Sequence, residues 1–191
     1  SYPPEDVARM KALMVEAYGI ALKAGEPFAG RAKRYLSAFE TFIAEAEAIW
    51  DGYKDRPALV HAEKKAYYRP STDTINIPEL SEFDSSEEYY STLFHEASHS
   101  TGAKKRLDRL TDDWFGSENY GREELVAEIA SQILCQSVGI TKTLENSAAY
   151  CASWAKAIRA TKAQAFVNAC ASASKASDYI LGVKQEDCVK K

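Results

Sequence analysis

The apolar pattern of the chain predicts helices at both ends and a short run of strands between them. Apolar residues recur at helical spacing over 4–24 and again over 30–51, with the helix-breaking Gly25–Pro27 between the two segments. So short a break favours an antiparallel helical pair. We therefore expect an N-terminal helical hairpin over 1–56 that packs on a main domain over 57–191.

The helical spacing of apolar residues ends at the start of this main domain, where short strand-like runs begin. Ala58–His61, Lys65–Tyr68 and Thr74–Ile77 have the length and composition of strands, and turn-forming residues separate the last two. Pro78 ends the third run and suits an edge position. The pattern predicts a small antiparallel sheet directly before the next helix.

A helix is predicted between Ser85 and Gly102. Ser85 followed by Glu88 has the spacing of a capping box, and Gly102 stands where a helix end favours a residue that tolerates the left-handed conformation. The apolar positions in between repeat at i, i+3, i+4 and i+7, namely Tyr90, Leu93, Phe94 and Ala97. One side of this helix is therefore expected to face a core.

Helical periodicity returns after a polar stretch at 110–121 that reads as a loop. A helix over 123–135 is predicted to bury Leu125, Val126, Ile129 and Ile133 on one side and to place Glu124, Ala127, Glu128, Ser131 and Cys135 on the other. Gly139 suits its C-terminal end. Two more helices are predicted over 144–160 and 162–182, the second with Phe166, Val167, Cys170, Tyr179 and Ile180 as apolar anchors. The fold class is thus α+β and mostly helical.

The charge of the chain narrows the choice of partners. The formal net charge of −4 opposes nucleic-acid binding by bulk electrostatics. A basic cluster from Lys104 to Arg109 leaves a local nucleic-acid or anionic contact open, although such a run is more often a solvated face. No prediction of oligomeric state follows.

The chain carries no pattern of a membrane protein. No apolar run approaches the roughly 20 residues of a membrane span, and residues 1–6 lack the pattern of a signal peptide. The four cysteines form no C-x-x-C pair, which favours reduced thiols over a cysteine zinc site. We expect a cytoplasmic protein without a membrane partner.

The predicted helix from Ser85 carries His95, Glu96 and His99 in an H-E-x-x-H arrangement. Residues four apart share one face of a helix, so both imidazoles can point at one metal ion, and Glu96 can reach a water held there. Two of the three histidines of the chain lie in this motif. His61, the third, is expected to be an ordinary structural histidine.

The downstream helix offers a third metal ligand among Glu123, Glu124 and Glu128. Glu123 lies at the edge of the apolar face, which makes it the weaker candidate. Glu124 and Glu128 are four apart on a face of small residues, where another helix can approach closely. Helix geometry does not choose between these two.

Several separated blocks of this chain, in order, resemble the zincin-like metallopeptidase domain of ArdC-type antirestriction proteins and related phage and plasmid polyvalent proteins. The similar blocks are 66–78, 89–102, Phe115–Glu118, Arg122–Glu128, Glu145–Tyr150 and Ala176–Leu181, within a match over about 57–182. The chain has Ala103 where family members often have a histidine. It shows no counterpart of the family's single-stranded-DNA-binding domain in residues 1–56.

The resemblance implies a gluzincin-like fold and one Zn²⁺ per chain, held by His95, His99 and Glu124. In thermolysin-like gluzincins an acid four residues after the ligand glutamate supports a metal-bound histidine, which implies that role for Glu128. Glu96 would be the catalytic general base of a zinc-dependent metallopeptidase acting on a peptide or protein. The alternative is a metal-stabilised antirestriction module, or a module that binds nucleic acid or protein, without proteolysis.

Two features of the substrate site are also expected. The strands before the metal helix could offer an edge to an extended peptide. A tyrosine could steady the oxyanion, with Tyr67, Tyr68, Tyr120 and Tyr150 as the candidates.

Overall fold

The structure is a computed structural model that describes residues 42–111, 118–140 and 162–183. The predicted helices over 4–24 and 144–160, and the first part of the one over 30–51, lie outside these ranges. Within them, residues 42–52 are helical, as the sequence predicts. The remaining elements are β1 Ala58–Val60, β2 Tyr67–Arg69, β3 Thr74–Asn76, the short 3-10 helix η1 Leu80–Glu82, α3 Ser86–Thr101, α4 Glu118–Ser137 and α6 Lys162–Leu181. The predicted fold class, mostly helical with one small sheet, is confirmed.

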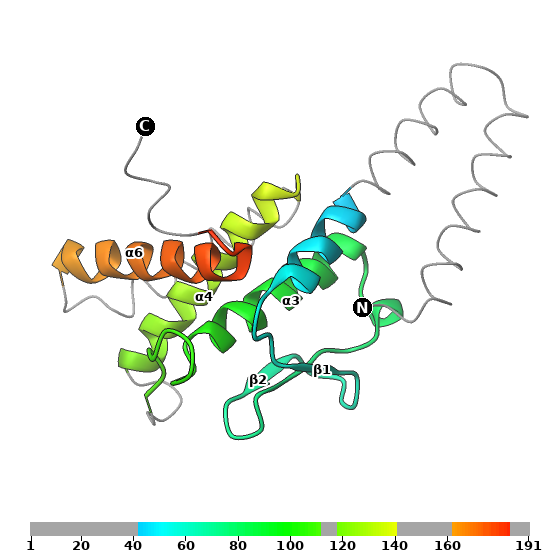
Figure 1. Cartoon of the computed structure of the whole chain (residues 1–191), viewed down its shortest axis with the longest axis horizontal. Coiled ribbons are helices and arrows are strands. Elements are labelled where there is room, and N and C mark those ends of the chain that lie inside the picture. The colour runs from blue at the N-terminus through cyan, green and yellow to red at the C-terminus, as the bar shows by residue number, and fades with distance from the viewer. Residues whose placement is uncertain (1–41, 112–117, 141–161, 184–191) are drawn as a thin grey trace, which may run out of the picture.

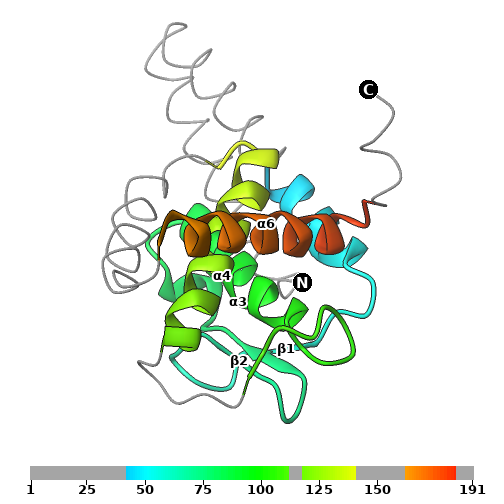
Figure 2. The ribbon, with the colours of Figure 1, turned by 90° about the vertical axis from the view of Figure 1, so that its left-hand side faces the viewer.

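The helices form layers above the sheet. The sheet packs on one side of α3, α4 packs on α3, and α6 covers α4 (Figures 1 and 2). In the described part of the chain, no helix is both long and apolar enough to pass through a bilayer.

The sheet is mixed, so the prediction of a wholly antiparallel sheet was wrong for its first strand. The strand order is β1-β3-β2, with β2 antiparallel and β1 parallel to β3. The third strand is therefore central, and the edge position expected from Pro78 was also wrong. The reason is the fully buried Asn76, whose side-chain oxygen accepts hydrogen bonds from the amides of Ala62 and Glu63. Its side-chain nitrogen donates to the carbonyls of Glu63 and Lys65. These bonds hold the connection after β1 against β3, so β1 pairs with β3 and leaves β2 at the other edge.

Helix α3 begins as predicted but ends differently. The Ser85 side chain accepts a hydrogen bond from the Glu88 amide at 3.3 Å. Gly102, however, has φ −75° and ψ −9°, which is right-handed rather than left-handed. A Cβ at this position would lie 2.9 Å from Cγ of Leu110 and 3.2 Å from Nη2 of Arg109. Glycine is therefore required here by close packing, because the chain folds back over the end of the helix.

Helix α4 begins at Glu118 instead of Glu123, so residues 118–121 are not loop as predicted. Gly121, which signals a loop in sequence, is buried inside this first turn. Gly139 does adopt the predicted left-handed conformation, with φ +79°. Ile133 was expected to be buried but is 38% exposed. The buried apolar side chains at this end of α4 are instead Leu134, Cys135 and Val138.

Two apolar clusters hold the layers together. The larger joins the helix at 42–52 to α3, β3 and the end of α4 through aromatic residues such as Trp50, Tyr53, Tyr89, Tyr90 and Phe94. The smaller is a seam between α4 and α6 formed by Leu125, Val126, Ala130, Ala169, Ala173 and Ala176. Phe166 and Val167, predicted as anchors of the last helix, are 46% and 56% exposed. Alanines take the seam because they let the two helices approach closely.

The two described cysteines, Cys135 and Cys170, are free thiols. Cys151 and Cys188 lie outside the described residues. Free thiols agree with the expectation of reduced cysteines for the two that can be seen.

Candidate metal centre

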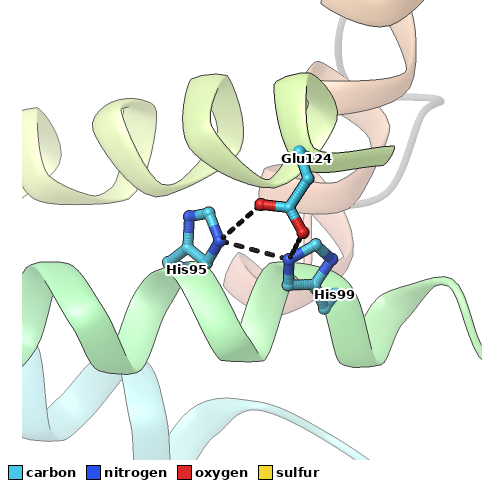
Figure 3. A group of neighbouring side chains, drawn as sticks. All are labelled: His95, His99 and Glu124. Atoms are coloured by element: carbon cyan, nitrogen blue, oxygen red, sulfur yellow. Dashed lines mark hydrogen bonds and ion pairs between the residues drawn. The ribbon is translucent and has the colours of Figure 1, made fainter. Parts of the chain in front are cut away.

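Three side chains from two helices converge on one point. His95 and His99 project from successive turns of α3, and Glu124 reaches them from the facing side of α4 (Figure 3). The Nε2 atoms of the two imidazoles lie 3.1 Å apart. Glu124 Oε2 lies 3.6 Å from Nε2 of His95, and its Oε1 lies 3.4 Å from Nε2 of His99.

The spacing of these donor atoms suits a tetrahedral metal ion. Ligand atoms about 2.0–2.1 Å from a tetrahedral zinc ion lie about 3.3 Å from one another. The three donors have separations of 3.1, 3.4 and 3.6 Å. Two imidazoles and one carboxylate are also a donor set that zinc favours. His95, His99 and Glu124 thus form a group that can hold a divalent ion.

Electrostatics at this point favour a positive charge. Burial alone would lower the pKa of His99, but contacts with the carboxylates of Glu123 and Glu124 raise that pKa to about 10. Burial would also lower the pKa of His95, but contacts with the carboxylates of Glu124 and Glu128 outweigh this effect and raise that pKa. Burial would raise the pKa of Glu124, but the two imidazoles hold it well below its usual range. A proton or a metal ion is stabilised here by the same carboxylates.

Glu128 supports the far side of one imidazole. Its Oε2 lies 3.1 Å from Nδ1 of His95, one helical turn beyond Glu124. A carboxylate at that nitrogen fixes the tautomer and direction of a metal-binding histidine. Glu128 thus lies behind His95, the position that the resemblance to gluzincins implies for a supporting acid, and Glu124 as the metal ligand stays a prediction.

Glu123 also belongs to the site, contrary to the expectation that it would stay at the apolar edge. Its Oε1 lies 3.5 Å from Nδ1 of His99. Arg109 forms a two-pronged ion pair with it, from Nη2 to Oε1 at 2.8 Å and from Nε to Oε2 at 3.1 Å. The pairing draws the carboxylate toward α3. Sequence reasoning missed Arg109 because its only signal was membership of a basic cluster.

Glu96 faces a cavity next to the converging donors. The cavity has a volume of about 600 Å³, and its wall includes Glu96, His95 and His99 from α3. Glu96 is 8% exposed, and no hydrogen bond or ion pair to its carboxylate occurs among the described residues. A carboxylate at the cavity wall that no described residue engages in a hydrogen bond or ion pair is placed to act on a molecule in the cavity.

The remaining predicted residues divide into those at the cavity and those elsewhere. Tyr67, Tyr68 and Tyr120 line the cavity, and Tyr150 lies outside the described residues. Tyr68 donates a hydrogen bond to Asp73 at 2.8 Å, and burial is the main cause that raises the pKa of its phenol to about 12. His61 lies 2.9 Å from the carbonyl of Ile77 in the sheet region, which fits a structural histidine.

Most cations of the basic cluster after α3 form ion pairs with carboxylates of the same chain. Lys105 and Arg106 both contact the carboxylate of Asp73, at 2.6 and 2.8 Å. Arg109 is paired with Glu123, as described above. These three cations therefore do not form a free anion-binding surface, which weakens the case for a nucleic-acid contact at this place.

Comparisons with known proteins agree with this geometry. A family model described as zincin-like metallopeptidase matches residues 37–172. DNA primase TraC of Escherichia coli is 46% identical over 129 residues, and protein y4eC of Sinorhizobium fredii is 37% identical over 121 residues. The Mn(II)-bound crystal structure of antirestriction protein ArdC from plasmid R388 superimposes with a TM-score of 0.61 at 37% identity.

The chain spans only part of each of these relatives. Its match to TraC takes in 67% of this chain and 9% of TraC, and the match to y4eC takes in 63% of this chain and 39% of y4eC. The match to ArdC takes in 73% of this chain and 52% of that chain.

Proposed function

The chain belongs to the zincin-like metallopeptidase family, and from this premise we propose that it is a zinc-dependent hydrolase that cleaves a peptide bond in a peptide or protein substrate. The observation that carries the proposal is the placement of Glu96. Its carboxylate shares one cavity wall with two imidazoles that converge with Glu124.

The residues that would hold the ion are His95, His99 and Glu124. One divalent ion per chain matches their spacing, and two nitrogens with one carboxylate favour zinc. Mn(II) is the ion in the ArdC structure, so a divalent ion in the related domain supports the assignment. A zinc ion so held supplies a Lewis acid that activates water and polarises the scissile carbonyl.

The residues of the chain would carry the proton transfers and hold the substrate. Glu96 would accept a proton from the attacking water and deliver it to the leaving amine. Strand β2 is an edge of the sheet, and its Tyr67 and Tyr68 line the cavity. An extended peptide could add to this edge through main-chain hydrogen bonds. Tyr67, Tyr68 and Tyr120 are the described candidates for support of the oxyanion. Tyr67 and Tyr68 each donate to a carboxylate at 2.8 Å, that of Glu63 and that of Asp73, and either phenol would have to leave this partner to do so.

The test compares wild type with Glu96→Gln. Metal content and cleavage of a fluorogenic peptide library are measured for both, with Glu87→Gln in the first turn of the same helix as the control. Glu96→Gln should keep the metal and lose cleavage by at least about 10²-fold, the usual contribution of a general base. Cleavage at the wild-type rate in Glu96→Gln would remove Glu96 from the mechanism.

A second function is favoured by the 37% identity to the antirestriction protein ArdC. On this hypothesis the metal stabilises a module that binds nucleic acid or a protein without cleaving it. Salt-dependent binding of single-stranded DNA, together with unchanged binding by Glu96→Gln and no cleavage of any peptide by wild type, would favour it.

A further inference from the structure

The loop after α3 returns along the last turn of that helix and delivers one arginine to the metal centre. The side chain of Arg109 is only 14% exposed. Its Nη1 donates to Oγ1 of Thr101 at 2.9 Å, and its Nη2 donates to the carbonyl of Ser98 at 3.1 Å. The guanidinium is thus fixed to α3 before it meets Glu123 of α4.

We propose that Arg109 is a positioning residue that aligns His99 for metal binding by holding the carboxylate of Glu123 against Nδ1 of that histidine. The inference rests on the proposed function, in which His99 is a metal ligand. It adds a residue from outside both helices of the metal centre.

The chemistry of the contact favours this role. A guanidinium fork pairs with both oxygens of a carboxylate and so fixes its orientation as well as its charge. The two prongs on Glu123, at 2.8 and 3.1 Å, leave Oε1 directed at His99, 3.5 Å away. A carboxylate acceptor at Nδ1 favours the tautomer with the proton on that nitrogen and leaves Nε2 directed at the point where the donors converge.

The two histidines are then supported in different ways. Glu128 reaches Nδ1 of His95 from its own position on α4, at 3.1 Å. Glu123 makes a longer contact with His99 and shares its carboxylate with Arg109. Loss of Arg109 would leave Glu123 free to rotate away or to compete for the cation.

A purely structural role for Arg109 must be distinguished from this one, because it also ties the loop to α3. Arg106 provides a matched control from the same loop. Its side chain is likewise buried and forms a two-pronged pair with a carboxylate, that of Asp73. It also donates to a carbonyl of α3, that of Ser100, yet it touches no residue of the metal centre.

The experiment measures the Zn²⁺ affinity of the full chain by competition with a chromophoric chelator, and the visible absorption spectrum of the Co²⁺-loaded protein. The variants are Arg109→Gln, Arg109→Lys, Glu123→Gln, the double variant Arg109→Gln/Glu123→Gln, and Arg106→Gln. Arg109→Gln and Glu123→Gln should each weaken Zn²⁺ binding by about 10–100-fold and alter the Co²⁺ spectrum. The double variant should be no weaker than the weaker single one, since both act on the same imidazole. Arg109→Lys should recover part of the affinity, and Arg106→Gln should leave both readouts unchanged.

Wild-type affinity in Arg109→Gln, or an equal loss in Arg106→Gln, would overturn the inference while leaving the proposed function standing. If Arg109→Gln does not fold, Glu123→Gln decides alone, because it leaves the bonds of Arg109 to Ser98 and Thr101 in place. A wild-type protein that binds neither Zn²⁺ nor Co²⁺ would overturn the proposed function and this inference with it.

Discussion

The carboxylate of Glu124 spans both imidazoles, since each of its oxygens lies near a different Nε2. Glu128, one turn further along α4, contacts Nδ1 of His95. Glu124 therefore lies where the donor atoms of both histidines converge, whereas Glu128, one helical turn away, lies behind the imidazole of His95. Similar side chains have different consequences for a bound ion.

Substitution of these two acids should separate their contributions. Glu124→Ala should lose most of the metal, because one of three protein donors is removed. Glu128→Ala should keep the metal with an affinity about 10–100-fold weaker, because the imidazole is less well oriented. Zn²⁺ affinity measured by chelator competition checks both, with the exposed Gln136→Ala on the same helix as control. A greater loss in Glu128→Ala than in Glu124→Ala would reverse the order.

Among single residues, the sequence predicts site residues that lie close together on one helix. It misses contacts between residues that only the fold brings together. His95, Glu96 and His99 can be found because their spacing on one helix brings them together. Glu123 was misjudged because its side chain is oriented by Arg109, from a loop whose return path no periodicity encodes.

At the scale of elements, α4 is held on two sides. It carries the acids toward α3 and packs its other side on α6 through the alanine seam. Small residues at this seam set the distance between the two helices. The position of α4, and hence of its carboxylates, depends on that distance.

A larger side chain in the seam should separate the helices. Ala173 is fully buried there, so Ala173→Leu should lower the free energy of unfolding by about 1–3 kcal/mol through overpacking. Ala171→Leu, at an exposed position of the same helix, should have little effect. Urea unfolding measures both, and equal stability of the two variants would contradict the close packing of α4 on α6.

For helices and strands too, the sequence predicts local features better than features that depend on distant contacts. Periodicity places α3 and α6 within a residue or two of their observed bounds. It misses the first turn of α4, because Gly121 signals a loop in the sequence although it is helical and buried in the structure. The parallel pairing of β1 also escapes it, because that pairing depends on the side chain of Asn76 binding a distant stretch of backbone.

At the scale of the whole molecule, one carboxylate joins the sheet to the loop after α3. Asp73, in the turn between β2 and β3, accepts contacts from Lys105, Arg106 and the phenol of Tyr68. Burial would raise the pKa of Asp73, but these hydrogen bonds hold it well below its usual range. The edge strand β2 and the return loop therefore share an anchor that depends on the ionised form.

Stability should depend on pH through this carboxylate. A folded-state pKa below the unfolded value of about 3.9 gives a stabilisation that is fully present at pH values above about 3.9. This stabilisation is lost progressively as the pH falls from there through the lower, folded-state pKa. Asp73→Asn should cost about 2 kcal/mol of unfolding free energy at neutral pH. The difference from wild type should shrink progressively below about pH 4.

Urea unfolding of wild type and Asp73→Asn between neutral pH and about pH 3 checks this, with the exposed Asp84→Asn as control. A difference between wild type and Asp73→Asn that stays constant over the whole range would show that the ionised carboxylate is not the anchor.

The division into a hairpin over 1–56 and a domain over 57–191 stays a prediction. The helix at 42–52 buries Ala46 and Trp50 in the same cluster as α3. The family match likewise begins at residue 37. We propose that this helix is an integral part of the core of the zincin-like domain.

Leu110 and Arg109 lie so close to Gly102 that this position should tolerate few substitutions. Any side chain there would press on Leu110 and on the guanidinium that holds Glu123. In a saturation screen scored by metal retention, position 102 should reject substitutions as strictly as the histidines, although it contributes no functional group. Intolerance to substitution at position 102 would then look like that of a metal ligand, although the glycine contributes only the absence of a side chain.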